Sequence, residues 1–225
     1  MGVMGEMGMM GRMGVKRWVA LVAGMAVCGM AAAAPNGLVI LLTDYGADSI
    51  YVGVLKGAIY TKNTAARVDS ISNSIPSYDI VAGAYLLSES CREYPAGTVF
   101  CCVVDPGVGT SRKQVALETN AGQYFVGPDN GLLWLVAQRD GIKELRETDN
   151  KALWREGVES STFHGRDVFG PVAAALANGT PLESVGKKLD ALVKLDVEPS
   201  RIENGVAVGT VIRAELAERF PVLSF

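Results

Sequence analysis

The chain is poor in the residues that bind transition metals or nucleic acids. It has one histidine, His164, and four cysteines among 225 residues, which excludes the usual zinc sites because these need clustered Cys and His ligands. Lysine and arginine number 21 against 24 aspartates and glutamates, and they form no basic run. A nucleic-acid partner is therefore not expected, since binders of the phosphate backbone depend on clustered cations.

A glycine-rich loop ending in Lys-Ser or Lys-Thr is also lacking, so nothing indicates a phosphate site of the Walker type. A magnesium site built from Asp alone stays open on composition. Cys101 and Cys102 are adjacent in a predicted strand, where successive side chains point to opposite faces, so they do not hold a metal together. We expect both to be small buried hydrophobic residues, with a Cys91–Cys101 disulfide as the alternative in an oxidising compartment.

The N-terminal apolar run, Trp18–Met30, is shorter than the ~20 residues that a bilayer span requires. It follows Lys16 and Arg17 and precedes a run of alanines, an order typical of a secretory signal peptide. We therefore expect residues 1–34 to be removed near Pro35 and the protein to be exported, periplasmic or secreted, without a stable membrane anchor. A buried helix of the domain is the alternative, although the segment has no polar face.

From residue 38 onward, strand-like apolar stretches alternate with stretches of helical spacing. The predicted strands are Leu38–Leu42, Val68–Ile71, Thr98–Val104, Val115–Glu118 and Tyr124–Val126. The predicted helices are Ile50–Tyr60, Ile80–Ser90, Leu132–Gln138 and Val168–Ala177. This alternation predicts an α/β fold, a mostly parallel sheet with helices on both faces, in a domain spanning 35–190. Further strand-like pieces follow at Leu192–Val197 and Val206–Ile212.

Two carboxylates leave the ends of predicted strands, Asp44 after the first and Asp105 after the third. Ligands of parallel sheets bind beyond the carboxyl ends of the strands, so both groups are candidates for a site. The turn from Asp105 to Arg112 contains Pro and Gly residues that let the backbone approach a ligand closely. An ordinary turn would explain the glycines, but it does not explain why Asp and Arg bracket them.

His164 lies in a loop between Phe163 and Gly165, where Arg166 and Asp167 are close enough in sequence to orient it. A lone histidine is more often an ordinary surface residue than a catalytic one, so His164 alone decides nothing. The Gly127–Gly131 segment is explained equally well by turn formation and by a place in the site.

Taken together, four segments resemble the S-adenosylmethionine (SAM) hydroxide adenosyltransferases, relatives of the fluorinating and chlorinating enzymes. The resemblance covers 38–189, and its segments are Thr43–Gly46, Asp105–Arg112, Gly127–Gly131 and Thr162–Asp167. The halogenating relatives replace the Asp-Pro-Gly-Val-Gly turn, so the chain resembles the water-using branch.

The resemblance implies hydrolysis of SAM to adenosine and L-methionine, with SAM as substrate and no cofactor. It implies that Asp105, Arg112 and His164 generate and position a hydroxide, and that Asp44 binds the ribose. The substrate-contacting residues it suggests are Asp44, Asp105, Asp129 and Asn130.

The family also has a β-rich second domain, and its substrate lies between subunits of a trimer. We accordingly expect a homotrimer at full length, with 191–225 as a linker and the remnant of a truncated second domain. The alternative is an inactive or ligand-binding fragment of such an enzyme.

Overall fold

The structure is a computed structural model, and it describes only part of the chain. Residues 1–32 lie outside the described part, and the predicted signal peptide falls almost wholly on them. No helix within the described ranges is long and apolar enough to cross a bilayer. The described residues are 33–157, 160–197, 200–209, 213–216 and 221–224.

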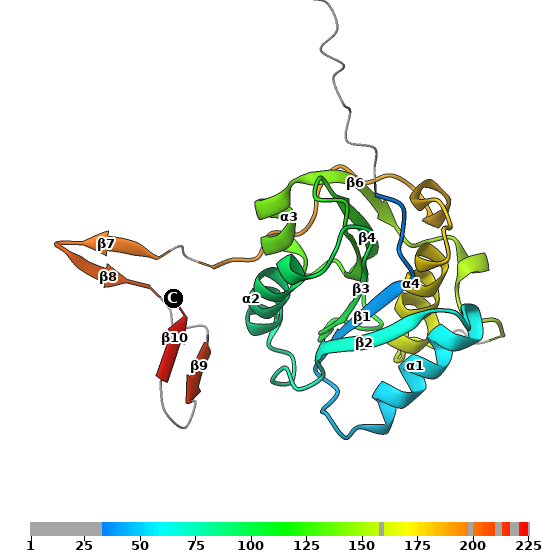
Figure 1. Cartoon of the computed structure of the whole chain (residues 1–225), viewed down its shortest axis with the longest axis horizontal. Helices are drawn as coiled ribbons and strands as arrows, with labels where there is room; N and C mark the ends of the chain where they lie inside the picture. The colour runs from blue at the N-terminus through cyan, green and yellow to red at the C-terminus, as the bar shows by residue number, and fades with distance from the viewer. Residues whose placement is uncertain (1–32, 158–159, 198–199, 210–212, 217–220, 225) are drawn as a thin grey trace, which may run out of the picture. The chain divides into compact units, whose positions relative to one another are not determined.

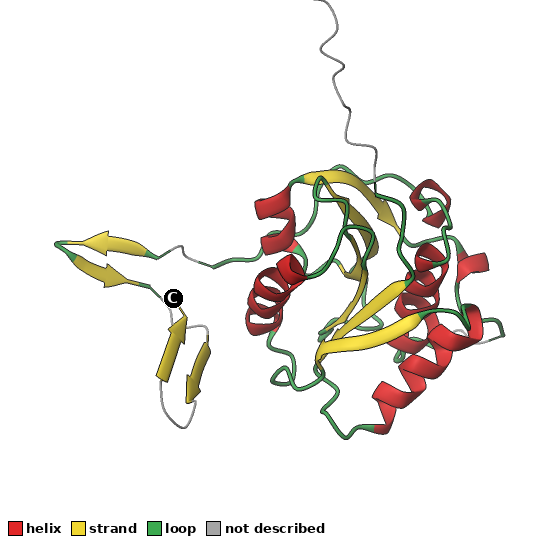
Figure 2. Ribbon diagram, viewed as in Figure 1, coloured by secondary structure: helices red, strands yellow, loops and turns green. Residues whose placement is uncertain are grey.

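A six-stranded sheet forms the centre of the domain (Figures 1 and 2). Its strands are β1 (Leu38–Thr43), β2 (Arg67–Ser72), β3 (Val99–Val103), β4 (Gln114–Thr119), β5 (Tyr124–Pro128) and β6 (Ile142–Glu147). Five of these six match predicted strands. The sixth, β6, was not predicted, because its charged residues obscure the apolar alternation.

The strands lie in the order β2-β1-β3-β5-β4-β6. The β1–β2, β1–β3 and β3–β5 pairs are parallel, whereas β4 is antiparallel to both β5 and β6. β4 therefore begins at the end of the sheet where the parallel strands have their C-termini. The predicted α/β class with a mostly parallel sheet is confirmed, and the reversed β4 is the addition to it.

Within the described residues, four α-helices cover the sheet, two on each face. Helices α1 and α4 share one apolar cluster with the sheet, and α2 and α3 share the other. Every residue of α4 is buried, which suits a helix that is apolar on all sides. The helices are α1 (Ile50–Lys62), α2 (Ile80–Ser90), α3 (Trp134–Asp140) and α4 (Gly170–Ala177).

Alternate residues of β3 face the two layers of helices. Cys101 belongs to the cluster under α1 and α4, whereas Cys102 and Cys91 belong to the cluster under α2 and α3. All three thiols are free and buried. The Cys91–Cys101 disulfide considered above is thus wrong, because the sheet separates the two residues. Burial also raises the pKa of the Cys101 thiol to about 12, so it stays protonated.

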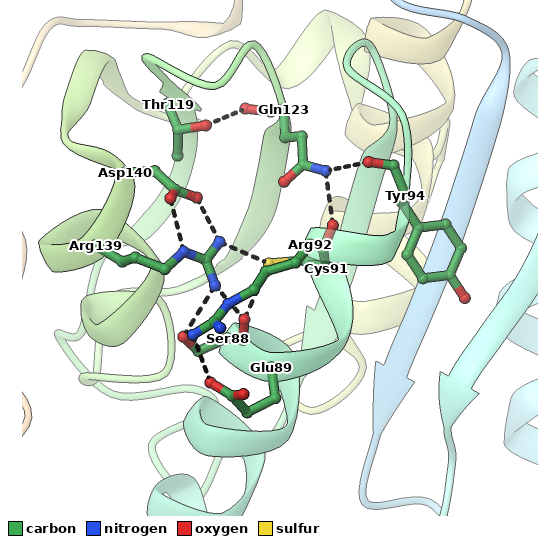
Figure 3. A network of polar contacts seen from close by, with 9 residues as sticks. All are labelled: Ser88, Glu89, Cys91, Arg92, Tyr94, Thr119, Gln123, Arg139 and Asp140. Atoms are coloured by element: carbon green, nitrogen blue, oxygen red, sulfur yellow. Dashed lines mark hydrogen bonds and ion pairs between the residues drawn. The ribbon is translucent and has the colours of Figure 1, made fainter.

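A partly buried polar network joins the end of α2 to α3 (Figure 3). Arg139 pairs with Asp140 through two nitrogens, with Nε 2.6 Å from Oδ1. The same guanidinium donates to the Ser88 hydroxyl at 3.2 Å and to the Cys91 sulfur at 3.2 Å. Gln123 donates to the carbonyl oxygen of Cys91 at 2.8 Å. These bonds satisfy polar groups that would otherwise be costly to bury.

Beyond the sheet, the residues 192–197 do not form the predicted strand. Leu192 is buried against the cluster under α2 and α3 instead, and the Val193 amide donates to Asp129. The Val193 amide is thus bonded to the Asp129 carboxylate and not to the main chain of a neighbouring strand.

Two antiparallel hairpins follow, formed by β7 with β8 and by β9 with β10. Part of the predicted strand Val206–Ile212 is β8, and residues 210–212 lie outside the described residues. The hairpin strands are β7 (Arg201–Glu203), β8 (Val206–Val208), β9 (Arg213–Leu216) and β10 (Pro221–Ser224).

Candidate active site

Asp44 and Asp105 lie where two neighbouring parallel strands end. β1 ends at Thr43 and β3 at Val103, and the Asp44 amide donates to the Val103 carbonyl at 3.3 Å. The two aspartates thus extend from the same edge of the sheet, as the sequence predicts. Main-chain pairing at this edge fixes the starting points of the loops that build the site.

The turn after β3 brings Arg112 back to Asp105. Its backbone is closed by a hydrogen bond from Val108 to Asp105 at 3.3 Å and by one from Thr110 to Gly107 at 3.1 Å. Gly109 has a φ of +79°, a conformation that favours glycine. The reversal places residues that are seven apart in sequence face to face.

Asp105 and Arg112 form a two-point ion pair. Nε of Arg112 donates to Oδ1 of Asp105 at 2.8 Å, and Nη2 donates to Oδ2. Their side chains are only 5% and 9% exposed, respectively. A buried pair must recover the cost of desolvating both charges, and a two-point contact between a guanidinium and a carboxylate is the strongest geometry available for that.

His164 completes the predicted trio. Its Nδ1 lies 2.8 Å from Nη2 of Arg112 and 3.2 Å from Nε2 of Gln114. The Phe169 ring meets the imidazole edge-on, with centroids 6.3 Å apart, and also lies 5.4 Å from the Arg112 guanidinium carbon. Gln114 was missed in the sequence, because an amide at the start of a strand carries no signal of its own.

The pKa of His164 is lowered from its ordinary value, first by burial and then by the Arg112 charge, against the opposing effect of Asp105 and Asp167. Removing an imidazolium from water disfavours the charged form, and a neighbouring guanidinium disfavours it further. The neutral form of His164 therefore predominates at pH 7.

Arg166 and Asp167 do not orient His164, contrary to the expectation from sequence. They pair with each other through two hydrogen bonds of 2.6 and 2.8 Å, and the Arg166 guanidinium lies over the Phe163 ring at 4.7 Å. The reason is the π-helical turn η3 (Gly165–Phe169) that starts immediately after His164. The imidazole is held instead by Arg112, in the turn after β3, and by Gln114, the first residue of β4.

His164 also lines a cavity of about 290 Å³. This cavity is therefore a candidate route by which small molecules reach the imidazole. The other residues that line it are Lys151, Trp154, Ser160, Ser161, Asp167 and Val168.

Tyr45 is a second residue that sequence reasoning left unassigned. Its hydroxyl lies so close to Gly165 that a side chain at Gly165 would collide with it. Burial is the main cause that raises the pKa of Tyr45 well above its ordinary value, with the Asp44 and Asp105 charges adding to the effect. The phenol therefore stays neutral and packs the strand end against the His164 loop.

Asp44 is partly exposed, and its Oδ2 accepts a hydrogen bond from the Tyr78 amide at 2.9 Å. Tyr78 has a φ of 66°, which is rare for a bulky residue and costs conformational energy, and its side chain is 68% exposed. The carboxylate holds this strained residue at the edge of the site.

The side chains of Asp129 and Asn130 both form hydrogen bonds with main-chain groups of the domain. Asp129 accepts from the Val193 amide at 2.8 Å. Asn130 donates to the Val104 carbonyl at 3.0 Å and accepts from the Leu132 amide at 3.1 Å. The proposed substrate contacts of this pair stay a prediction, and each side chain already has an internal structural partner.

No group of three or more His, Cys, Asp or Glu in the described ranges is arranged to hold a metal ion. The trio is a charged cluster made of a carboxylate, a guanidinium and a neutral imidazole. Such a cluster can stabilise an anion next to Arg112 while its own net charge stays near zero.

Comparison with known proteins connects this geometry to a family. The family model described as SAM hydroxide adenosyltransferase N-terminal domain matches residues 39–186. An (R)-S-adenosyl-L-methionine hydrolase from Methanocaldococcus jannaschii is 37% identical over 179 residues, covering 78% of this chain and 65% of that protein. A fluorinase from an Actinoplanes species is 27% identical over 201 residues, covering 78% of this chain and 67% of the fluorinase.

A solved structure supports the same relationship. The crystal structure of an uncharacterized conserved protein from Thermotoga maritima superposes with a TM-score of 0.75 at 40% identity, over 79% of this chain and 67% of that one. The chain spans about two thirds of the length of each of these relatives. From the match of residues 39–186 and from these identities, the chain belongs to the SAM hydroxide adenosyltransferase family.

Proposed function

We propose that the protein hydrolyses SAM to adenosine and L-methionine. The observation that carries this proposal is the continuous contact from Asp105 through Arg112 to His164, in a member of this family. The higher identity to the M. jannaschii hydrolase than to the Actinoplanes fluorinase, 37% against 27%, favours water over a halide as the nucleophile.

The reaction needs a nucleophile more than it needs an acid. A water oxygen bonds to the ribose 5′ carbon while the bond from that carbon to sulfur breaks, and the electron pair goes to sulfur. The sulfonium cation thereby becomes the neutral thioether of methionine, and one proton is released for each water consumed. Because the leaving group is neutral, no proton donor is required at sulfur.

Arg112 supplies the electrostatic part of the mechanism. Free water has a pKa of about 15.7, so a site without a metal must stabilise hydroxide with fixed charges. Arg112 is cationic at any relevant pH and attracts hydroxide. Asp105 offsets the repulsion between Arg112 and the cationic substrate, and His164 orients the water. In-line attack then depends mainly on positioning.

Three further properties form part of the proposal. Asp44 would bind the ribose hydroxyls, which suits a partly exposed carboxylate at the strand edge. A homotrimer is the assembly proposed for the full-length protein, to be checked by light scattering after gel filtration. Export with removal of residues 1–34 is proposed from the composition of that segment, and mass spectrometry of the exported protein would give its new terminus.

The decisive experiment is incubation with SAM in ¹⁸O-labelled water, followed by liquid chromatography and mass spectrometry. Hydrolysis at the 5′ carbon yields methionine and adenosine that carries ¹⁸O in its 5′ hydroxyl. Methylthioadenosine as the product would show cleavage of a different carbon–sulfur bond and would refute the proposal. Binding of SAM without any product would support the ligand-binding alternative.

A further inference from the structure

Two nitrogen atoms that carry hydrogens converge on Nδ1 of His164. Nη2 of Arg112 lies 2.8 Å away and Nε2 of Gln114 lies 3.2 Å away. Arginine has five N–H donors and no acceptor, so the Arg112 contact requires Nδ1 to be the acceptor. In a neutral imidazole one nitrogen donates and the other accepts. The proton of neutral His164 is therefore on Nε2.

The Gln114 amide reinforces this assignment. With its NH₂ group toward the ring, it offers Nδ1 a second donor. The opposite orientation would place an amide oxygen against a ring lone pair that already accepts from Arg112, which is repulsive. The backbone of Gln114 is held where β4 pairs with β5 opposite Pro128, and its carbonyl accepts from the Thr148 amide at 2.8 Å. The amide thus approaches His164 from a fixed position.

The charged form of His164 does not fit this environment. An imidazolium would direct an Nδ1–H toward two donor groups, with the Arg112 charge adjacent. Asp105 and Asp167 are the groups that favour the charge, and burial and Arg112 oppose them with the larger effect. The arrangement therefore selects one tautomer of one protonation state.

We propose that Gln114 is a positioning residue that, together with Arg112, fixes His164 as the neutral Nε2–H tautomer. The effect on turnover rests on the proposed SAM hydrolysis, whereas the tautomer itself does not. In this state His164 presents a hydrogen-bond donor and does not take a proton from water at Nδ1. Both carboxylate oxygens of Asp105 are occupied by Arg112, so the proton released from water passes to solvent.

The tautomer can be measured directly because His164 is the only histidine in the chain. The full chain, labelled with ¹⁵N-histidine and free of any histidine tag, gives one pair of imidazole nitrogen resonances. At neutral pH we expect Nδ1 at the chemical shift of an unprotonated nitrogen and Nε2 at that of a protonated one. The reverse pattern, or the averaged pattern of two exchanging tautomers, would overturn the proposal.

Gln114→Glu is the sharpest variant, because it exchanges the donor for an acceptor of nearly equal size. A carboxylate there should favour a proton on Nδ1, move both nitrogen shifts and raise the pH at which His164 becomes charged. If SAM is the substrate, kcat should fall about 10-fold or more with a smaller change in KM, since a wrong tautomer misdirects the proton. Gln114→Met removes the donor without adding charge and should give partial tautomer exchange.

The matched control is Gln138→Glu, the same substitution at an exposed position of α3. It should leave the nitrogen shifts and kcat unchanged. Wild-type nitrogen shifts in both Gln114 variants would remove Gln114 from the role proposed here. If the wild-type chain releases no adenosine, the proposed function fails, and the nitrogen shifts still decide the tautomer.

Discussion

Gly109 lies so close to Ser161 that a Cβ atom on Gly109 would stand 2.6 Å from the Ser161 carbonyl oxygen. The turn that carries Arg112 is therefore docked directly on the loop that leads to His164. The alignment of the trio depends on this contact between two segments that are distant in the sequence.

Gly109→Ala should reduce turnover by about 10²-fold, because displacing a reacting group by ~1 Å has that effect. Adenosine release and thermal unfolding would both be measured. Gly179→Ala is the matched control, since Gly179 also has a positive φ, +90°, but its Cβ would meet nothing within 4 Å. Both changes should cost about 1–2 kcal/mol of backbone strain, and only the first should affect turnover. Equal kcat in the two variants would contradict the docking role.

Arg112→Lys should lower kcat by roughly 10²-fold or more, although the charge is kept. An ammonium cannot hold Asp105 at two points and His164 at the same time, and loss of a charge-stabilising donor has an effect of this size. Steady-state kinetics would give kcat and KM. The control is Arg92→Lys in an exposed ion pair, which should behave as the wild type. Unchanged kcat in Arg112→Lys would show that charge alone is sufficient.

Tyr45 and Gly165 should be energetically coupled. Gly165→Ala forces a methyl group against the Tyr45 hydroxyl, and it should destabilise the protein by about 1–3 kcal/mol through overpacking. Tyr45→Phe removes that oxygen and should restore part of the loss. A double-mutant cycle on the free energy of unfolding should then give a coupling of at least ~0.5 kcal/mol. Strict additivity would mean that the collision is relieved elsewhere.

Activity should fall on the acid side because the working form of His164 is neutral. Its folded-state pKa lies below the ordinary value of 6.5, so the acid limb should have its midpoint below pH 6.5. Between the folded-state pKa and about pH 6.5, the imidazole binds a proton more readily in the unfolded chain than in the folded one. The free energy of unfolding therefore rises with pH through this interval and levels off above about pH 6.5.

His164→Gln is the control for the pH profile, because it lacks the titrating ring. The acid limb due to His164 should be missing from its profile, and an NMR titration of the wild-type imidazole should follow the same curve as the activity. A midpoint above 6.5 in that titration would contradict the lowered pKa.

The sequence predicts the scaffold of the site better than its contacts. The strands before Asp44 and Asp105 are short apolar runs that end in turn residues, and this local signal is strong enough to place both carboxylates at one edge of the sheet. Gln114 could not be predicted, since its meeting with His164 depends on where β4 enters the sheet. The prediction that Arg166 and Asp167 orient His164 was wrong, because these two side chains pair with each other within a π-helical turn.

The reversed direction of β4 has a consequence for how the site could be altered. A strand that started from the opposite edge of the sheet would need a long crossover to deliver Arg112 and Gln114 to Asp105. Here a single short turn does so, and Asp105, Arg112 and Gln114 lie within one ten-residue segment of the chain. All three side chains can therefore be exchanged by replacing this one peptide segment, while the pairing of β1, β2 and β3 is left as it is.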